Sequence, residues 1–130
     1  MNNNIIWKED CKEFHSDYPC DILAANDYRS CAECNFYNPY TKRILLIKTG
    51  QIGDVIRTTP IVKALYKKYK NPHITWFVDE VSKPLLTNNK YVDRVLVNNL
   101  NSVLRLRSEE FDILINLEIS PPSTSLAGQI

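Results

Sequence analysis

Short apolar segments alternate with amphipathic ones along residues 43–130. The first apolar segment, RILLIK at 43–48, precedes a loop that contains two glycines, which is typical of a buried strand. Further strand-like segments occur at 74–78 (ITWFV), 92–97 (VDRVLV) and 111–117 (FDILINL). Their β-branched and aromatic residues favour extended structure. The pattern therefore predicts four strands.

Helical segments are expected between these strands. Thr59-Pro60 is typical of a helix start, because threonine caps helices and proline suits the first turn. Asn71-Pro72 then ends this helix. Its apolar face is expected to comprise Ile61, Ala64, Leu65 and Tyr69. Further helices are expected at 82–89, at 101–110 and from 120 onwards.

Alternation of strands and helices at this spacing predicts βαβ units in an α/β fold. Such units form a Rossmann-like parallel sheet with right-handed crossovers and helices on both faces. A complete doubly wound domain usually has more than four strands. We therefore expect a Cys-bearing leader over 1–42, followed by the truncated N-terminal part of a sheet domain over 43–130.

Charge and composition exclude several classes of protein. The chain has net charge +1 and is 44% hydrophobic, which argues against a strongly basic nucleic-acid binder and against disorder. No apolar run approaches the roughly 20 residues that span a bilayer. The first residues lack the pattern of a secretion signal. We expect a cytoplasmic protein that binds no nucleic acid.

The loop TGQIGD at 49–54 is the first candidate site. Ligands of open parallel sheets bind at the carboxyl ends of the strands. Gly50 and Gly53 are expected to let the backbone turn tightly and a substrate approach the main chain. The loop has neither the dinucleotide fingerprint nor the P-loop pattern. Asp54 then has two interpretations, as a cap of the next helical turn or as a catalytic carboxylate.

The segment 43–66, RILLIKTGQIGDVIRTTPIVKALY, resembles the opening strand, loop and helix of glycosyltransferase family 9. This is the family of ADP-heptose:lipopolysaccharide heptosyltransferases. The similarity continues through 74–80 (ITWFVDE), 84–97 (PLL and YVDRVLV) and 111–118 (FDILINLE). The order and spacing of these pieces together carry the resemblance, which covers 43–130.

This resemblance implies a GT-B architecture, in which two Rossmann-like domains face a cleft. The N-terminal domain holds the acceptor and the C-terminal domain binds the nucleotide-sugar donor. The family's general base corresponds to Asp54. The intact protein would transfer heptose or a similar sugar, with inversion, to a lipopolysaccharide or another glycan or lipid-linked glycan acceptor. The donor domain would lie beyond Ile130, so this chain alone is expected to be inactive.

Further residues of the loop and of the fourth strand are candidates for binding the acceptor. They are Gly50, Gln51, Gly53, Arg57, Thr58 and Glu118. Arg57 could meet an acceptor phosphate or carboxylate, or could equally be a surface charge. Ser120, Ser123 and Thr124 are weaker candidates, because a polar loop with a helix cap explains them better.

Two other functions stay open at this stage. An oxidoreductase would use Asp79, at the end of the second strand, to hold a ribose hydroxyl, but the missing middle glycine argues against it. A non-catalytic interaction module that carries a metal is the other alternative.

Four lysines of the first long helix are a further feature of the surface. They are Lys63, Lys67, Lys68 and Lys70. They suit a solvated helix face, or peripheral contact with the anionic inner face of the membrane.

All four cysteines of the chain, Cys11, Cys20, Cys31 and Cys34, lie within the leader. One C-x-x-C pair with two further cysteines predicts a tetrahedral thiolate site for zinc, and an iron–sulfur cluster could use the same ligands. Free thiols or disulfides are the alternative. A leader of about 40 residues has little core, so a metal would give it a reason to fold. His15 is a spare ligand candidate.

Overall fold

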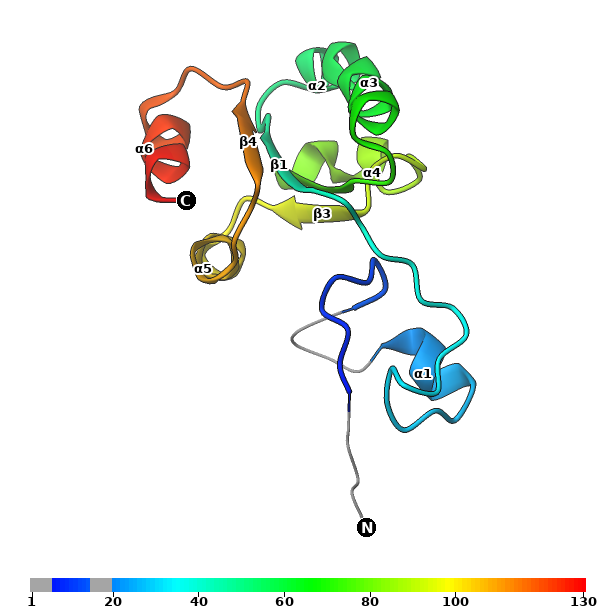
Figure 1. Ribbon diagram of the computed structural model, residues 1–130. Coiled ribbons are helices and arrows are strands. Elements are labelled where there is room, and N and C mark those ends of the chain that lie inside the picture. The colour runs from blue at the N-terminus through cyan, green and yellow to red at the C-terminus, as the bar shows by residue number, and fades with distance from the viewer. Residues whose placement is uncertain (1–5, 15–19) are drawn as a thin grey trace. The chain divides into compact units, whose positions relative to one another are not determined.

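The computed structural model describes residues 6–14 and 20–130, and His15 lies outside these ranges (Figure 1). The chain divides into two compact units, Met1–Tyr40 and Thr41–Ile130, which we call unit 1 and unit 2. In unit 1 the described residues form one short helix, α1 (Asp21–Ala25). They also form an isolated antiparallel bridge between Cys11 and Pro39.

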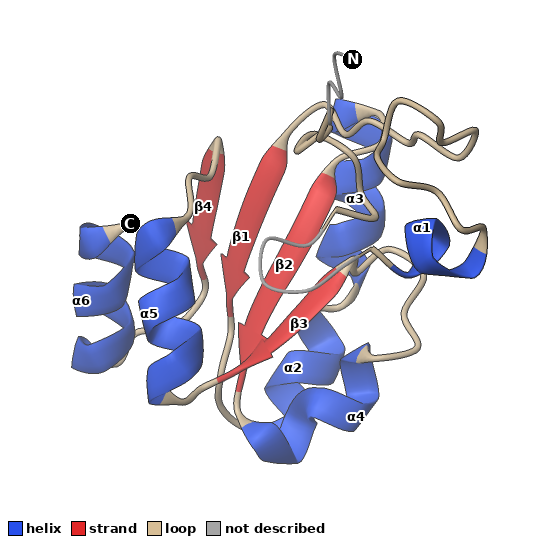
Figure 2. Cartoon of the chain, turned by 90° about the horizontal axis from the view of Figure 1, so that it is seen from below, coloured by secondary structure: helices blue, strands red, loops and turns tan. Residues whose placement is uncertain are grey.

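Unit 2 contains one sheet of four parallel strands, as Figure 2 shows. The strands are β1 (Arg43–Ile47), β2 (His73–Val78), β3 (Arg94–Val97) and β4 (Ile113–Asn116). Their order in the sheet is β3-β2-β1-β4, so β3 and β4 are the edge strands of the described sheet. The predicted α/β fold with a Rossmann-like parallel sheet is confirmed.

Helices cover both faces of this sheet (Figure 2). They are α2 (Ile52–Thr58), α3 (Pro60–Tyr69), the 3₁₀ helix η1 (Glu80–Ser82), α4 (Lys83–Leu86), α5 (Leu100–Ser108) and α6 (Pro121–Gln129). No helix in the described part of the chain combines the length and the apolar character that a membrane crossing needs.

Side chains of β1 alternate between two hydrophobic cores. Ile44 and Leu46 belong to the core under α2, α3 and α4, whereas Leu45 and Ile47 belong to the core under α5 and α6. All four side chains are 0% exposed. A strand buried on both faces reads as a continuous apolar run, which is why RILLI carries no polar alternation.

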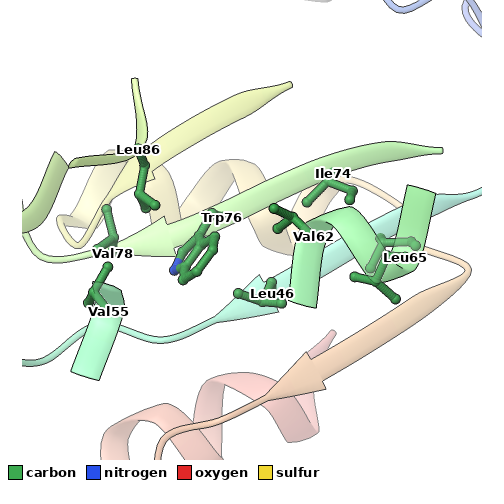
Figure 3. Packing of buried hydrophobic residues seen from close by; sticks show 9 residues of the cluster. Leu46, Val55, Val62, Leu65, Ile74, Trp76, Val78 and Leu86 are labelled. Carbon is green, nitrogen blue, oxygen red and sulfur yellow. The ribbon is translucent and has the colours of Figure 1, made fainter. Parts of the chain in front are cut away.

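Trp76 of β2 lies at the centre of the first core (Figure 3). Its ring is fully buried, and its indole Nε1 donates a hydrogen bond to the backbone oxygen of Lys48 at 3.1 Å. The polar end of the ring is therefore satisfied, and the bond ties β2 to the residue that follows β1. Helix residues Val55, Val62, Leu65 and Leu86 complete this core.

Two helices follow the glycine loop where the sequence predicts one. The predicted helix start at Thr59-Pro60 is confirmed, because α3 begins at Pro60 with Thr59 at its cap position. The sequence missed α2, which runs from Ile52 to Thr58, and Thr59 between the two helices has helical backbone angles. Proline lacks an N–H, so it interrupts the hydrogen-bond ladder between α2 and α3.

The predicted apolar face of α3 also needs a correction. Ala64 is exposed, and Val62 is buried in its place beside Leu65. Ile61 and Tyr69 pack at the margin of the core as predicted.

A buried ion cluster closes the amino-terminal side of the sheet. Arg94 of β3 donates two hydrogen bonds to the carboxylate of Glu109, at 3.0 and 2.7 Å. Arg43 of β1 donates a third at 2.8 Å. Burial acts to raise the pKa of Glu109, but the two arginines outweigh it and hold the pKa below its ordinary value. The cluster links a central strand to an edge strand through the residue that follows α5.

We expect Glu109→Ala to lower the free energy of unfolding by about 3 kcal/mol, because it leaves two largely buried guanidinium groups without their carboxylate. Urea unfolding at neutral pH measures the change. Glu110→Ala is the matched control, since Glu110 is the exposed neighbour, and it should change stability by less than about 0.5 kcal/mol. Equal losses in the two variants would contradict the role of the cluster.

Candidate active site

The strand order places a candidate site at the carboxyl ends of β1 and β4. From β1 the chain moves to β2 and β3 on one side, and β4 then pairs with the other side of β1. The last residues of the two strands, Ile47 and Asn116, are partners in the register. In open α/β sheets, ligands bind outside the carboxyl ends of the strands where the order reverses. The residues at this point are 48–54 and 117–120.

Glu118 joins the two strand ends. The N–H of Leu117 donates to the oxygen of Ile47 at 2.8 Å, which extends the pairing by one residue. Glu118 Oε1 then accepts the backbone N–H groups of Thr49 and Gly50, both at 2.9 Å. Lys48 Nζ lies 3.2 Å from the same oxygen. A carboxylate just after β4 thereby holds the first residues of the glycine loop.

The surroundings of Glu118 keep its side chain ionised. Burial acts to raise its pKa, but the N–H of Gly50 and the ammonium of Lys48 outweigh this effect and hold the pKa below its ordinary value. The carboxylate is only 13% exposed. These contacts give Glu118 a role in positioning the loop, and its contact with an acceptor stays a prediction.

The tight turn of the loop depends on Gln51 and not on the glycines. Gln51 has φ 45° and ψ 116°, whereas the described glycines all have negative φ. The expectation that Gly50 and Gly53 provide the turn is therefore wrong, since Gly53 lies inside α2. A side chain held in such a region costs about 1–3 kcal/mol and persists only when its surroundings fix it. The hydrogen bonds from the N–H groups of Thr49 and Gly50 to Glu118 supply that constraint.

Asp54 lies in the first turn of α2, just past the strained residue. Its backbone N–H donates to the oxygen of Gln51 at 3.0 Å. Its carboxylate accepts a hydrogen bond from Arg57, one turn further along the same helix. This bond holds the pKa of Asp54 below its ordinary value. The side chain is an ionised group with 36% of its surface exposed.

The capping interpretation of Asp54 receives only partial support. A carboxylate in the first helical turn is favoured by the helix dipole. The residue at the cap position is Gln51, however, and no side chain accepts a capping hydrogen bond there. The carboxylate of Asp54 contacts Arg57 and does not cap the helix. It can therefore still act on a ligand outside the helix.

Several predicted acceptor contacts are engaged within helices instead. The hydroxyl of Thr58 contacts the backbone oxygens of Asp54 and Val55, at 3.0 and 2.9 Å. The hydroxyls of Ser120 and Ser123 lie 2.8 Å apart. Thr124 Oγ1 donates to the oxygen of Ser120 at 3.1 Å. The hydroxyl of Thr58 is therefore engaged within α2 and its contact with an acceptor stays a prediction, whereas the turn before α6 accounts for the serine and threonine residues.

Asp79 and Lys48 extend the site in ways that the sequence did not indicate. The N–H of Asp79 donates to the oxygen of Thr49 at 3.2 Å, and its carboxylate accepts from Asn98 Nδ2 at 3.0 Å. Lys48 pairs with Glu118. The sequence gives one signal for the Lys48–Glu118 pair, namely a lysine directly after a buried strand. It does not identify Glu118 as the partner, because that depends on which strand lies beside β1.

The four cysteines line one cavity of about 460 Å³ in unit 1. Each thiol is free and half-buried. Within 6–14 and 20–130, no three His, Cys, Asp or Glu side chains lie close enough together to hold a metal ion directly. The structure thus places the predicted ligands around one cavity, but it does not bring their sulfur atoms close enough together to bind one ion. These ligands are Cys11, Cys20, Cys31 and Cys34.

We expect Glu118→Gln to lower the free energy of unfolding at pH 7 by about 2 kcal/mol, because hydrogen bonds to a charged group are lost. The lowered pKa makes this stabilisation complete above the unfolded-state value of about 4.3. It is lost as the pH falls through the folded-state pKa. Urea unfolding at neutral and acidic pH measures the difference between variant and wild type.

That difference should shrink in acid. Glu110→Gln is the control for a carboxylate on the surface, and it should change stability little at either pH. A Glu118→Gln effect of the same size at both pH values would contradict the role of the ionised carboxylate.

Comparisons with known proteins bear on the fold and on the resemblance to glycosyltransferases. No protein-family model matches the chain. The chain is 24% identical over 85 residues to lipopolysaccharide heptosyltransferase 1 from Campylobacter coli, and the match covers 58% of this chain. It is 28% identical to a glycosyl transferase family 9 crystal structure from Veillonella parvula DSM 2008, with a TM-score of 0.59 over 70% of this chain.

The chain spans 25% of the length of the Campylobacter coli protein and 30% of the length of the Veillonella parvula protein. Both matches support the resemblance to glycosyltransferase family 9. The Rossmann-like sheet described above is therefore similar to one part of glycosyltransferases of this kind.

Proposed function

We propose that the protein containing this chain is an inverting glycosyltransferase and that unit 2 belongs to its acceptor-binding domain. The observation that carries the proposal is the ionised, partly exposed Asp54 on a constrained loop at the reversal of strand order. The similarity to two glycosyltransferases supports it. The donor would be a nucleotide-diphosphate sugar, with heptose or a similar sugar, and the acceptor a lipopolysaccharide or another glycan.

The proposed reaction is a single displacement at the anomeric carbon of the donor. The acceptor hydroxyl oxygen forms the new bond to this carbon, while the bond to the diphosphate breaks and the diphosphate leaves with its electron pair. Asp54 takes the proton of the hydroxyl as general base. Because Arg57 keeps its pKa low, this carboxylate is a weak base, so the proton moves only once bond formation has made the hydroxyl acidic.

The loop offers an acceptor several contacts beside Asp54. A Cβ built at Gly53 meets no atom within 4 Å, so a sugar can approach the backbone there. Gln51 is exposed and carries an amide that can hydrogen-bond a hydroxyl. Arg57 is 79% exposed and can reach an anionic group of the acceptor. The grip of Glu118 on the loop keeps these groups in a fixed arrangement.

The oxidoreductase alternative has no observation in its favour. Asp79, which it would require for a ribose hydroxyl, already accepts a hydrogen bond from Asn98. The predicted cytoplasmic location stays a prediction. Contact of the α3 lysines with a membrane surface also stays a prediction. These lysines are exposed. We also expect no sugar transfer by residues 1–130 alone, because the described residues contain a single Rossmann-like sheet and the donor needs a second one.

In the protein containing this chain, Asp54→Asn should lower the rate of sugar transfer by about 10²- to 10⁴-fold, because the amide cannot accept the proton. Binding of the nucleotide sugar should be unchanged. Release of nucleoside diphosphate from a panel of nucleotide sugars, with glycan acceptors present, measures the rate.

Glu80→Gln is the matched control, because Glu80 is an exposed carboxylate that follows β2 at the same edge of the sheet. It should transfer at the wild-type rate. A wild-type rate in Asp54→Asn would remove the assignment of the base. An absence of release by the wild-type protein with every donor and acceptor would overturn the proposed function itself.

Gly53→Ala should raise the KM for the acceptor while stabilising the fold. An added methyl meets no protein atom, and alanine in a helix is favoured over glycine by about 0.5–1 kcal/mol. Gly128→Ala in α6 is the control, since a Cβ there also meets no atom within 4 Å. Both variants should unfold at higher urea concentration, and only the Gly53 variant should bind the acceptor less tightly. Unchanged acceptor kinetics in both would contradict an approach of the acceptor at Gly53.

A further inference from the structure

Four cysteines from three separate segments of unit 1 converge on one cavity. Cys11 lies in the described segment 6–14, Cys20 precedes α1, and Cys31 and Cys34 form the C-x-x-C pair. The cavity has a volume of about 460 Å³. Its wall also includes aromatic side chains, namely Trp7, Phe14, Tyr28, Phe36 and Tyr37.

Backbone N–H groups point at two of these sulfur atoms. The N–H of Phe36 donates to Cys34 Sγ at 3.3 Å, two residues after the cysteine. The N–H of Asn38 donates to Cys11 Sγ at 3.5 Å. A neutral thiol is a weak acceptor, whereas a thiolate gains much more from such donors. Hydrogen bonds of this kind are the usual outer shell of thiolate ligands around a metal.

Backbone hydrogen bonds also tie two of these segments to other parts of unit 1. The N–H of Cys34 donates to the oxygen of Cys31 at 3.2 Å, which closes the C-x-x-C turn. The N–H of Cys31 donates to the oxygen of Ile6 at 2.9 Å, and the Cys11–Pro39 bridge joins the two ends of the unit. The segment of Cys11 and the C-x-x-C segment are thus each tied to another part of the unit.

Unit 1 has too little core to account for this arrangement by itself. Leu23 is the one buried apolar side chain among its described residues. Ile6, Trp7 and Phe36 are each close to half exposed. A unit of about 40 residues usually needs a metal or disulfides to fold. The four thiols are free, so disulfides do not supply this stabilisation here.

We propose that Cys11, Cys20, Cys31 and Cys34 are the four thiolate ligands of a metal centre that stabilises unit 1. The thiols surround the cavity. A single zinc ion would therefore draw them inward, whereas an iron–sulfur cluster would occupy the space between them. Both centres use the same four thiolates. The role is separate from sugar transfer, so it holds whether or not the proposed function does.

The test uses the chain purified under anaerobic, reducing conditions. Elemental analysis for zinc and iron, with an assay for acid-labile sulfide, should give either one zinc per chain or iron and sulfide in equal amounts. Visible absorption from sulfur-to-iron charge transfer distinguishes the second case. Either result supports the proposal and identifies the metal. A chain with neither metal in stoichiometric amount, or with its cysteines in disulfides, overturns it.

Two variants test the ligand set. The double variant Cys31→Ser with Cys34→Ser should lose the metal. Glu13→Gln should keep it, although Glu13 also lines the cavity. Loss of the metal from Glu13→Gln would contradict a ligand set of four thiolates.

A measurement on the wild type keeps the test valid should the double variant fail to fold. Titration of the metal-free chain with Co²⁺ should produce the absorption of tetrahedral cobalt bound to four thiolates. Chelation of the native metal should make 1–40 sensitive to protease while 41–130 stays protected. Cobalt spectra without thiolate bands, or unchanged protease resistance of 1–40 after the metal is removed, would overturn the proposal.

Discussion

Glu118 anchors the loop to which we assign the proposed chemistry of the molecule. One carboxylate oxygen accepts the N–H groups of Thr49 and Gly50 and pairs with Lys48. Without this bond the segment after β1 would have two largely buried amides to satisfy, which is costly away from water. Gln51, with its strained backbone, and the start of α2 come immediately after these two amides in the chain. The segment that leads to Asp54 is thus anchored by a residue that follows a different strand.

The two ends of the sheet use charge in different ways. At the amino-terminal end, Glu109 accepts hydrogen bonds from Arg43 and Arg94, so all three charged groups of this cluster hold strands together. At the carboxyl-terminal end, Glu118 does the same work, but Asp54 keeps a third of its surface in water. The two carboxylates at this end therefore have different roles. The buried carboxylate of Glu118 positions the loop, and the exposed carboxylate of Asp54 can contact a ligand. This division is what an active site on a rigid scaffold requires.

The strands could be predicted from the sequence, but the contacts between them could not. All four strands were predicted, because burial on one or both faces leaves an apolar run that few other structures produce. The start of α2 was missed, because Pro60 is a stronger local signal than any residue near Ile52. Gln51 could not be predicted to have positive φ beside two glycines. Glu118 and Thr49 are 69 positions apart, and their contact follows from a strand order that local patterns do not encode.

The edge strand β4 has a consequence for the behaviour of this chain in solution. Among the described residues β4 pairs with β1 alone, so the N–H and C=O groups along its other side face outward. Its residues Ile113, Leu114 and Ile115 are only half-buried. A short apolar strand with an open side is a template on which another extended chain can add. Self-association of residues 1–130 should therefore grow with their concentration.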